Sequence, residues 1–315
     1  MSVLTALRSV IKRLPIIDEI VSERDKLRRE VEALVSERDK FGFVPPGHFY
    51  SPVPSLDEIK GDESKIFGRV PRNIPGIDLH ESEQLKLLGD LVKCYEGMPF
   101  KPRKVEGLRY YFANDAYSLS DAIFLHCMIR HLKPKRIIEI GSGYSSCVSL
   151  DTNELFFDGS IKTTFIDPCP ALLRSLIKES DKNKIRVIPK RLQDIRLNEF
   201  EELEANDILF IDSTHVSKIN SDVNRIFFEI LPLLSPGTYI HFHDIFFPFE
   251  YPKEWIYEGR AWNEIYMLRT FLQYNNEFRI VLMNTFMAHF HEPFLREKMP
   301  LCLKYPGGNV WIRKK

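Results

Sequence analysis

The chain has 315 residues, of which 44% are hydrophobic and 28% charged, and this length allows one large domain or two. Its 44 basic residues balance 44 acidic ones, so no overall field favours nucleic acid or an anionic membrane. No apolar run approaches the length of a membrane span, and the five widely spaced cysteines fit neither a disulfide framework nor a zinc site. We therefore expect a cytoplasmic protein with no nucleic-acid partner and no membrane span.

Residues 1–44 are predicted to form an N-terminal helix that carries a heptad repeat. The sequence VSERDK occurs at 21–26 and again at 35–40, and apolar residues recur every seven positions. The members of this series are Ile20, Leu27, Leu34 and Phe41. Two interpretations stay open: a solvated helix crossed by salt bridges, and a short coiled coil through residues 16–41 that makes the protein a homo-oligomer.

Residues 45–100 are predicted to form a proline-rich connector that ends in a helix. Proline and glycine recur through VPPGHFYSPVP and RVPRNIPGIDL, and this composition favours extended, irregular structure. A helix is expected over 80–96, where several leucines lie on its inner side.

Residues 101–315 are predicted to form one α/β domain. A helix over 119–132 precedes a strand at 136–140, and a helix over 218–234 has Ile219 on its buried stripe. The further strands are expected at 162–166, 185–188, 207–211, 238–242, 278–284 and 309–315. This alternation predicts a doubly wound, mostly parallel, seven-stranded Rossmann-like sheet. The last two strands have no obvious crossover helix between them, which indicates an antiparallel pair at one edge of the sheet.

The first predicted strand runs directly into a glycine turn, EIGSGY (139–144). Gly141 and Gly143 allow the backbone to approach a ligand closely, and the following helix begins on small residues. Ser146 stands where a dinucleotide-binding fingerprint would place its third glycine. The turn alone is a weak signal, because many such turns only connect a strand to a helix.

The second and third predicted strands end in polar residues. Asp167 follows the second strand, where a carboxylate can accept hydrogen bonds from both ribose hydroxyls of an adenosine ligand. It could also cap the turn before Pro168, but together with the glycine turn the ribose role is favoured. Gln193 and Asp194 follow the third strand, where they can hydrogen-bond an adenine amino group.

Acidic and imidazole side chains gather at the ends of the fourth and fifth predicted strands. FIDSTH supplies Asp212 and His215, and IHFHD supplies His241, His243 and Asp244. By strand alternation, His241 and His243 point to the same side of the sheet. Such a cluster could supply a general base near neutral pH or ligands for a divalent ion.

Taken together and in this order, these residues resemble the class I S-adenosylmethionine-dependent methyltransferases, in the bacterial branch with an IDxxH fourth strand and an HD fifth strand. The resemblance covers about residues 118–315. It implies that the cofactor is S-adenosylmethionine. The residues that would bind it are Glu139, Gly141, Ser142, Gly143, Tyr144, Asp167, Gln193, Asp194 and Asp212.

The resemblance also implies catalytic roles for His215, Asp212 and His243. In metal-dependent relatives, carboxylates at these strand ends hold magnesium, and the matching positions here could hold a divalent metal such as Mg²⁺. These positions are Asp212, His243 and Asp244. A histidine where such relatives often have an acid leaves a second possibility, in which an imidazole takes the proton directly.

The expected partner is a small-molecule acceptor with a hydroxyl group, such as a sugar or a secondary metabolite. A base or a metal assists attack by a hydroxyl more than attack by an amine. The aromatic segment 246–264, with 288–292, could form the roof of the acceptor pocket or a hydrophobic cap over the sheet edge. The walls of such a roof would be Trp255, Trp262 and Tyr266.

Two other functions stay open at this point. The first is an NAD(P)-dependent oxidoreductase, against which Ser146 and the HFHD strand end argue. The second is a scaffold protein with a vestigial methyltransferase domain, against which the intact Gly141, Gly143, Asp167 and Asp212 argue.

Overall fold

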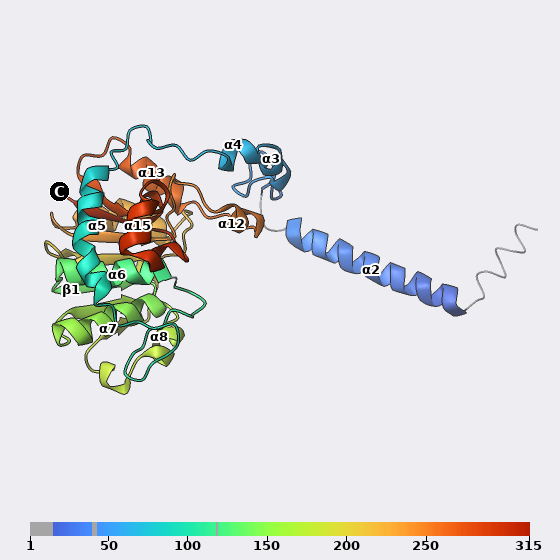
Figure 1. The fold of residues 1–315 in the computed structure, drawn as a ribbon. Coiled ribbons are helices and arrows are strands. Elements are labelled where there is room, and N and C mark those ends of the chain that lie inside the picture. Colours follow the sequence, from blue (N-terminus) through green and yellow to red (C-terminus); the bar gives the residue numbers. More distant parts are fainter. Residues whose placement is uncertain (1–14, 40–42, 118) are drawn as a thin grey trace, which may run out of the picture. The chain divides into compact units, whose positions relative to one another are not determined.

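The computed structural model describes residues 15–39, 43–117 and 119–315 (Figure 1). The described chain forms two compact units, Met1–Gly68 and Arg69–Lys315. Residues 1–14 of the predicted N-terminal helix and Phe41 of the heptad series lie outside the described residues.

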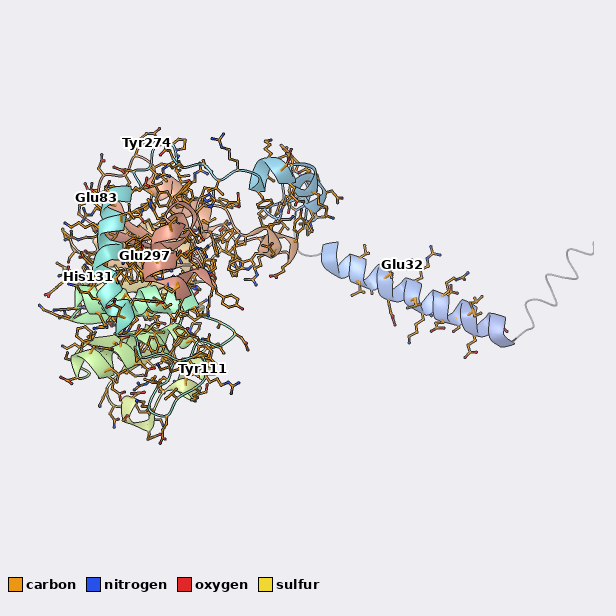
Figure 2. The ribbon with its side chains drawn as sticks, viewed as in Figure 1. Glu32, Glu83, Tyr111, His131, Tyr274 and Glu297 are labelled. Carbon is orange, nitrogen blue, oxygen red and sulfur yellow. The ribbon has the colours of Figure 1, made fainter. Side chains whose placement is uncertain are left out.

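The first unit contains one long helix, α2 (Pro15–Asp39), as the heptad pattern predicts. Ion pairs of the Arg28–Glu32 type run along its surface, and Glu32 projects away from the helix (Figure 2). The heptad residues Ile20, Leu27 and Leu34 are 60%, 55% and 64% exposed. The helix therefore presents an apolar seam with charged residues around it.

The connector after α2 is more regular than the proline content suggests. It contains two short helices, α3 (Leu56–Gly61) and α4 (Glu63–Phe67). The Ser55 hydroxyl caps α3 by accepting a hydrogen bond from the backbone N–H of Glu58. The expectation of an irregular connector is wrong here, because a serine cap followed by acidic residues is enough to start a helix.

The second unit is built on a seven-stranded sheet with the order β3-β2-β1-β4-β5-β7-β6. The first five strands are parallel, whereas β7 runs antiparallel to both of its neighbours, β5 and β6. The strands are β1 (Arg136–Ile140), β2 (Lys162–Ile166), β3 (Arg186–Ile188), β4 (Ile208–Ile211), β5 (Tyr239–His243), β6 (Phe278–Met283) and β7 (Asn309–Lys314). The doubly wound, mostly parallel fold predicted from the sequence is confirmed.

Helices cover both faces of this sheet. The helices α5 (Glu81–Glu96), α6 (Leu119–Leu132) and α7 (Tyr144–Phe157) pack side by side in one layer (Figure 1). On the opposite face, Phe227 stacks on Phe242 of β5 and meets Phe271 of α13 (Glu264–Leu272). The shorter helices are α8 (Ala171–Leu176), α9 (Asn198–Glu201) and α12 (Lys253–Tyr257). None of the helices in the described ranges is long and apolar enough to cross a membrane.

Two predicted segments differ from the structure. The predicted helix 218–234 begins only at α10 (Asp222–Arg225), because Ser221 accepts the N-terminal hydrogen bond from Asn224, and Ile219 is 96% exposed instead of buried. A π-helical turn (Ile226–Ile230) and α11 (Leu231–Leu233) continue it. Between β6 and β7, where no helix was expected, the chain forms α14 (Asn284–Phe290) and α15 (Glu292–Lys298).

Candidate active site

The glycine turn lies directly against the end of β4. The backbone N–H of Asp212 donates to the carbonyl of Ile140 at 2.9 Å. Gly141 has a φ of +83°, and a Cβ at this position would lie 2.1 Å from the carbonyl oxygen of Asp212. Residue 141 must therefore be glycine for the ends of β1 and β4 to meet as they do.

Gly143 differs from Gly141 in what the fold requires of it. Its backbone is extended, and a Cβ would approach one side-chain atom, Cδ2 of Leu172, at 3.2 Å. Its N–H donates to the hydroxyl of Ser146 at 3.1 Å as α7 begins. The protein's own packing thus restricts this position much less than position 141, because only the end of one flexible side chain would have to move.

Glu139 is buried behind the turn, and one of its oxygens has no partner. The hydroxyls of Ser145 and Ser146 donate to its Oε1 at 2.6 and 2.8 Å. Its Oε2 is buried and has no hydrogen-bond partner within the described part of the chain. Burial raises the pKa of Glu139 to about 8, although the two serine hydrogen bonds oppose this shift. Ser146, in the place of a third glycine, therefore helps to hold this acid.

Asp167 ties the turn to the end of β2. Its Oδ2 accepts from the Ser142 hydroxyl at 2.6 Å, and its Oδ1 accepts from the backbone N–H of Cys169 at 2.7 Å. The turn-capping role considered for Asp167 is thus present. Each carboxylate oxygen has a second lone pair, so capping does not prevent the carboxylate from accepting further hydrogen bonds.

Gln193 and Asp194 lie on the 3₁₀ turn after β3, and both side chains are engaged. The amide of Gln193 donates to the carbonyl of Asn220 at 2.8 Å, which links the loops after β3 and β4. Asp194 is exposed and pairs with Arg191 at 2.9 Å. Their predicted contact with adenine stays a prediction.

Asp212, His215 and Asp244 meet at the ends of β4 and β5. One possible ligand atom from each lies within 4.8 Å of the other two. His215 Nε2 is 3.3 Å from Asp212 Oδ1 and 3.6 Å from Asp244 Oδ2, while its Nδ1 is 2.7 Å from Glu264 Oε2. The residue adopts a φ of +59°, and Glu264 fixes the orientation of its ring. Its Nε2 is thereby directed at the two carboxylates.

His243 completes this cluster from the last position of β5. Its Nδ1 lies 3.5 Å from both Asp212 Oδ1 and Asp244 Oδ1, and its Nε2 lies 3.6 Å from Asp121 Oδ2. Asp121 is buried on α6 and accepts from the Asn309 amide at 2.6 Å. The two imidazoles are therefore surrounded by the carboxylates of Asp121, Asp212, Asp244 and Glu264.

These carboxylates change the protonation of the cluster. Burial opposes the charge on His215, but Asp212 and Glu264 outweigh it and raise its pKa to about 10. Burial also opposes charge on His243, and Asp244 and Asp212 hold its pKa well above the usual value. Conversely, burial would raise the pKa of Asp212, but His243 and His215 hold it well below its ordinary range. The imidazoles are therefore charged at neutral pH, unlike the near-neutral base expected from the sequence.

His241 lies beneath the cluster and is neutral. As predicted, it points to the same side of the sheet as His243, with ring centroids 6.3 Å apart. Its ring stacks on Phe210 at 4.2 Å and meets the edge of Trp311, and neither nitrogen has a hydrogen-bond partner within the described residues. Burial, with the nearby His243, lowers its pKa to about 3. This histidine packs the floor of the site.

The aromatic segment after β5 covers part of the cluster. The ring of Trp262 lies 4.5 Å from the ring of His215, and the guanidinium of Arg260 lies over both Trp262 and Trp255. The hydroxyl of Tyr266, the third predicted wall residue, donates to the carboxylate of Glu250. His291, from the segment 288–292 that was also considered for the roof, pairs with Glu81 on α5.

Asp121 and Glu264 are components of the site that sequence reasoning missed. Asp121 was detectable as the one acid of a helix that is mostly apolar and buried. Glu264 belongs to the aromatic segment, but no spacing in the sequence relates it to His215.

A buried ion network fixes the loop that leads into α6. The Arg109 guanidinium donates to Asp151 at 2.7 Å, to Asp181 at 2.8 Å and to Glu154 at 2.8 Å. Asp151, on α7, also accepts the backbone N–H of Arg109. The loop is thus attached to the helix that follows the glycine turn, and it carries Tyr117, whose ring lies 5.2 Å from His243.

Comparison with known proteins gives a consistent result. The model of a family described as a methyltransferase domain matches residues 138–245, which include the glycine turn, Asp212 and Asp244. An Archaeoglobus fulgidus protein, described as an uncharacterized protein, is 36% identical over 178 residues, covering 55% of this chain and 79% of its own length.

Two solved structures are also similar to this chain. An S-adenosylhomocysteine-bound methyltransferase from Podospora anserina is 17% identical, with 87% of this chain and all of that chain (100%) covered and a TM-score of 0.43. An O-methyltransferase from Bacillus cereus in complex with S-adenosylhomocysteine is 17% identical, with 82% and 97% covered and a TM-score of 0.42.

The match to the methyltransferase model lies on the strand ends that build the site, and the archaeal relative shares most of its length with this chain. The chain therefore belongs to the same family as the archaeal protein, and its residues 138–245 match a methyltransferase domain.

Proposed function

We propose that the protein transfers the methyl group of S-adenosylmethionine to a hydroxyl group of a small acceptor molecule. The observation that carries this proposal is the contact between the glycine turn and the charged cluster, where Gly141 lies against the carbonyl of Asp212. A cofactor bound at the turn and an acceptor bound at the cluster would be neighbours. Alignment of two reactants in this way supplies much of the acceleration in a transfer reaction.

The residues of the turn fit the cofactor. Glu139 Oε2 is buried without a partner, Gly143 has no side chain that would keep a ligand away from the turn, and Asp167 keeps free lone pairs at the end of β2. We assign the methionine part to Glu139–Tyr144, the ribose to Asp167 and the adenine to Gln193 and Asp194. When bound, S-adenosylmethionine supplies an already activated methyl group.

The proton of the acceptor hydroxyl must be removed as the hydroxyl attacks. His215 and His243 are both charged in this cluster, so either can take the proton only when its pKa falls. The pKa of His243 would fall if Asp212 and Asp244 shared their negative charge with a bound cation. We therefore propose His243 as the base, with Asp212 and His215 holding the cation beside the reacting hydroxyl.

The donor set also fits a divalent cation. Asp212, His215 and Asp244 offer two carboxylates and one imidazole, and Glu264 holds His215 Nδ1 so that Nε2 is the free ligand atom. In this set His215 replaces His243, which the sequence-based prediction had included with Asp212 and Asp244. An imidazole ligand suits Mn²⁺ or Zn²⁺ better than Mg²⁺. A bound ion would polarise the acceptor oxygen.

Metal binding can be tested without turnover. After dialysis against a chelator, added Mn²⁺ should raise the melting temperature of the protein. The electron paramagnetic resonance signal of free Mn²⁺ should decrease as the ion binds. His215→Ala should weaken both effects, whereas His289→Ala, an exposed histidine of α14, should leave them unchanged. Equal Mn²⁺ binding by all three proteins would remove His215 from the metal site.

The proposed activity is tested by binding and by methyl transfer. Calorimetry should detect S-adenosylmethionine binding to the wild type and to His215→Ala, and no binding of NADH. Transfer of labelled methyl groups into a small-molecule extract should fall by about 10²–10⁴-fold in His215→Ala and in Asp212→Ala. His289→Ala serves as the control. Unchanged transfer in both variants would remove these residues from the mechanism.

We also propose that α2 joins copies of the chain. Its exposed heptad residues would be buried in a two-stranded coil, and the charged residues around them would remain solvated. Light scattering should find an oligomer for the full chain and a monomer after deletion of residues 1–44. A monomer at all concentrations of the full chain would disprove this proposal.

A further inference from the structure

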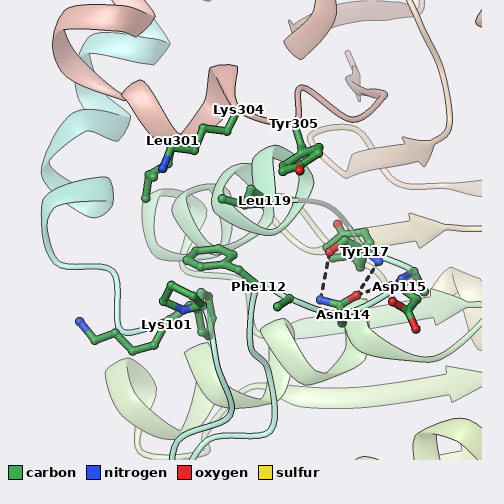
Figure 3. Close-up of a pocket in the computed structure, with 13 residues that line it drawn as sticks. Lys101, Phe112, Asn114, Asp115, Tyr117, Leu119, Leu301, Lys304 and Tyr305 are labelled. Carbon is green, nitrogen blue, oxygen red and sulfur yellow. Dashed lines mark hydrogen bonds between the residues drawn. The ribbon is translucent and has the colours of Figure 1, made fainter.

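A cavity of about 800 Å³ lies on the outer side of the loop that precedes α6 (Figure 3). Its walls come from the loop 100–117 and from the segment after α15. The apolar wall residues are Phe100, Phe112, Tyr117, Leu119, Leu301 and Tyr305. Small-molecule pockets of proteins have volumes of roughly 300–1,000 Å³ and mostly apolar walls. The cavity therefore has the size and lining of a ligand site.

The walls of this cavity are fixed before any ligand binds. The Asn114 side chain donates to the carbonyls of Tyr111 and Tyr117 and accepts from two backbone N–H groups of the same loop. Phe100 and Phe112 pack edge to face with centroids 6.2 Å apart. A preorganised pocket loses little conformational entropy when it binds a ligand.

The cavity adjoins the charged cluster through one side chain. Tyr117 lines the cavity, and its ring lies 5.2 Å from the ring of His243. Tyr111 of the same loop places its hydroxyl 3.2 Å from that of Tyr144, the last residue of the glycine turn and the first of α7. The loop thus separates the cavity from the proposed reaction centre by a single aromatic layer.

The cavity is lined by charged residues of both signs, and the basic residues lie apart from the acidic one. Lys101 and Lys304 are exposed at the cavity, and in the described part of the chain neither has an ion-pair partner. The neighbouring Arg103 and Lys104 are exposed as well. Asp115 lies on the side opposite Lys101, beside Tyr117 (Figure 3). The end of the cavity away from the cluster is therefore basic.

We propose that this cavity holds the non-reacting part of the acceptor, and that this part is an apolar or aromatic body carrying an anionic group. The body would lie among the aromatic walls, and Lys101 and Lys304 would bind the anion. The hydroxyl end would extend past Tyr117 toward the cluster. This inference rests on the proposed function, and it narrows the acceptors to amphiphilic anions.

The test uses 8-anilinonaphthalene-1-sulfonate, which combines an aromatic body with one anionic group and fluoresces in apolar sites. We expect one saturable site on the wild type. Lys101→Ala/Lys304→Ala should weaken binding by at least about tenfold, and Ala113→Trp, which fills the cavity from an exposed position, should abolish it. Lys86→Ala, an exposed lysine of α5, is the matched control.

Competition tests the chemical class of the ligand. Dodecyl phosphate should displace the dye at concentrations at least about tenfold lower than dodecanol or inorganic phosphate, because the site needs both parts of the ligand. Equal potency of dodecanol and dodecyl phosphate would overturn the role of the lysines. Wild-type dye binding in Ala113→Trp, or displacement of the dye by S-adenosylmethionine, would overturn the assignment to this cavity.

Calorimetry with S-adenosylmethionine on the same variants separates the two proposals. Retained cofactor binding together with lost dye binding supports the cavity assignment. Absence of cofactor binding by the wild type would refute the proposed function, while the dye measurements would still decide whether the cavity binds amphiphilic anions.

Discussion

The glycine turn at the end of β1 and the charged cluster at the ends of β4 and β5 touch each other, yet they are built differently. The acid behind the turn takes its partners from nearby sequence, since the hydroxyls of Ser145 and Ser146 both donate to Glu139. The cluster takes partners from distant helices, with Asp121 from α6 and Glu264 from α13. The setting of Glu139 is therefore local, whereas the cluster depends on the whole fold.

The largest effect of this difference should appear at Glu264. Glu264→Ala would leave the buried His215 Nδ1 and the Ser213 hydroxyl without their partner. Because such a loss leaves buried charge uncompensated, we expect the free energy of unfolding to fall by about 3–5 kcal/mol in chemical denaturation. Glu254→Ala, at an exposed position of α12, should change it by less than about 0.5 kcal/mol. Similar small values for both would mean that the cluster does not depend on α13.

Substitutions at the two glycines of the turn should differ in their effects on protein stability and on cofactor binding. Gly141→Ala forces a methyl group against the Asp212 carbonyl at positive φ, so the free energy of unfolding should fall by about 3 kcal/mol. Gly143→Ala should cost less than about 1 kcal/mol, because only the Leu172 side chain must move, but it should weaken S-adenosylmethionine binding, since its methyl group would lie at the proposed cofactor position. Denaturation and calorimetry measure the two quantities. The reverse pattern would contradict the assignment of the turn.

Asp167 should affect the ligand more than the fold. Asp167→Ala removes a half-buried turn cap, and we expect a loss of about 1 kcal/mol in stability. Cofactor affinity should fall by about tenfold or more in calorimetry, as expected from the loss of a charged hydrogen-bond acceptor. Glu179→Ala, an exposed control, should leave the affinity unchanged. Full affinity in Asp167→Ala would mean that the ribose lies elsewhere.

A different kind of effect, a pH dependence of stability, is expected at Glu139. Burial raises its pKa from 4.5 to about 8, so the folded protein keeps a proton that the unfolded chain releases. The stability that this proton provides is complete below about pH 4.5 and is lost as the pH rises to about 8. Glu139→Gln cannot ionise, so the variant should gain stability relative to the wild type across this range. If the free energies of unfolding of the wild type and of Glu139→Gln changed in parallel from about pH 5 to about pH 9, the raised pKa of Glu139 would be contradicted.

The sequence predicted most of the fold and four of the six residues of the charged cluster. Strand alternation and the glycine turn locate β1–β5, and the order of polar strand ends brings Asp212, His215, His243 and Asp244 together. Glu264 could not be predicted, because a contact between elements far apart in the chain has no periodic signal, whereas Asp121 could be noticed only as the one acid of α6. The raised pKa of His215 depends partly on Glu264, so it could not be predicted from the sequence either.

The attachment of Arg109 to α7 has a consequence for how the proposed cofactor and acceptor affect each other's binding. The same helix begins at the glycine turn and anchors the loop that forms the wall of the cavity. A ligand that stiffens this shared support on one side lowers the entropic cost of binding on the other, and such coupling is reciprocal. Cofactor and acceptor should therefore bind cooperatively, and the enzyme would hold its cofactor most tightly when an acceptor is present to receive the methyl group.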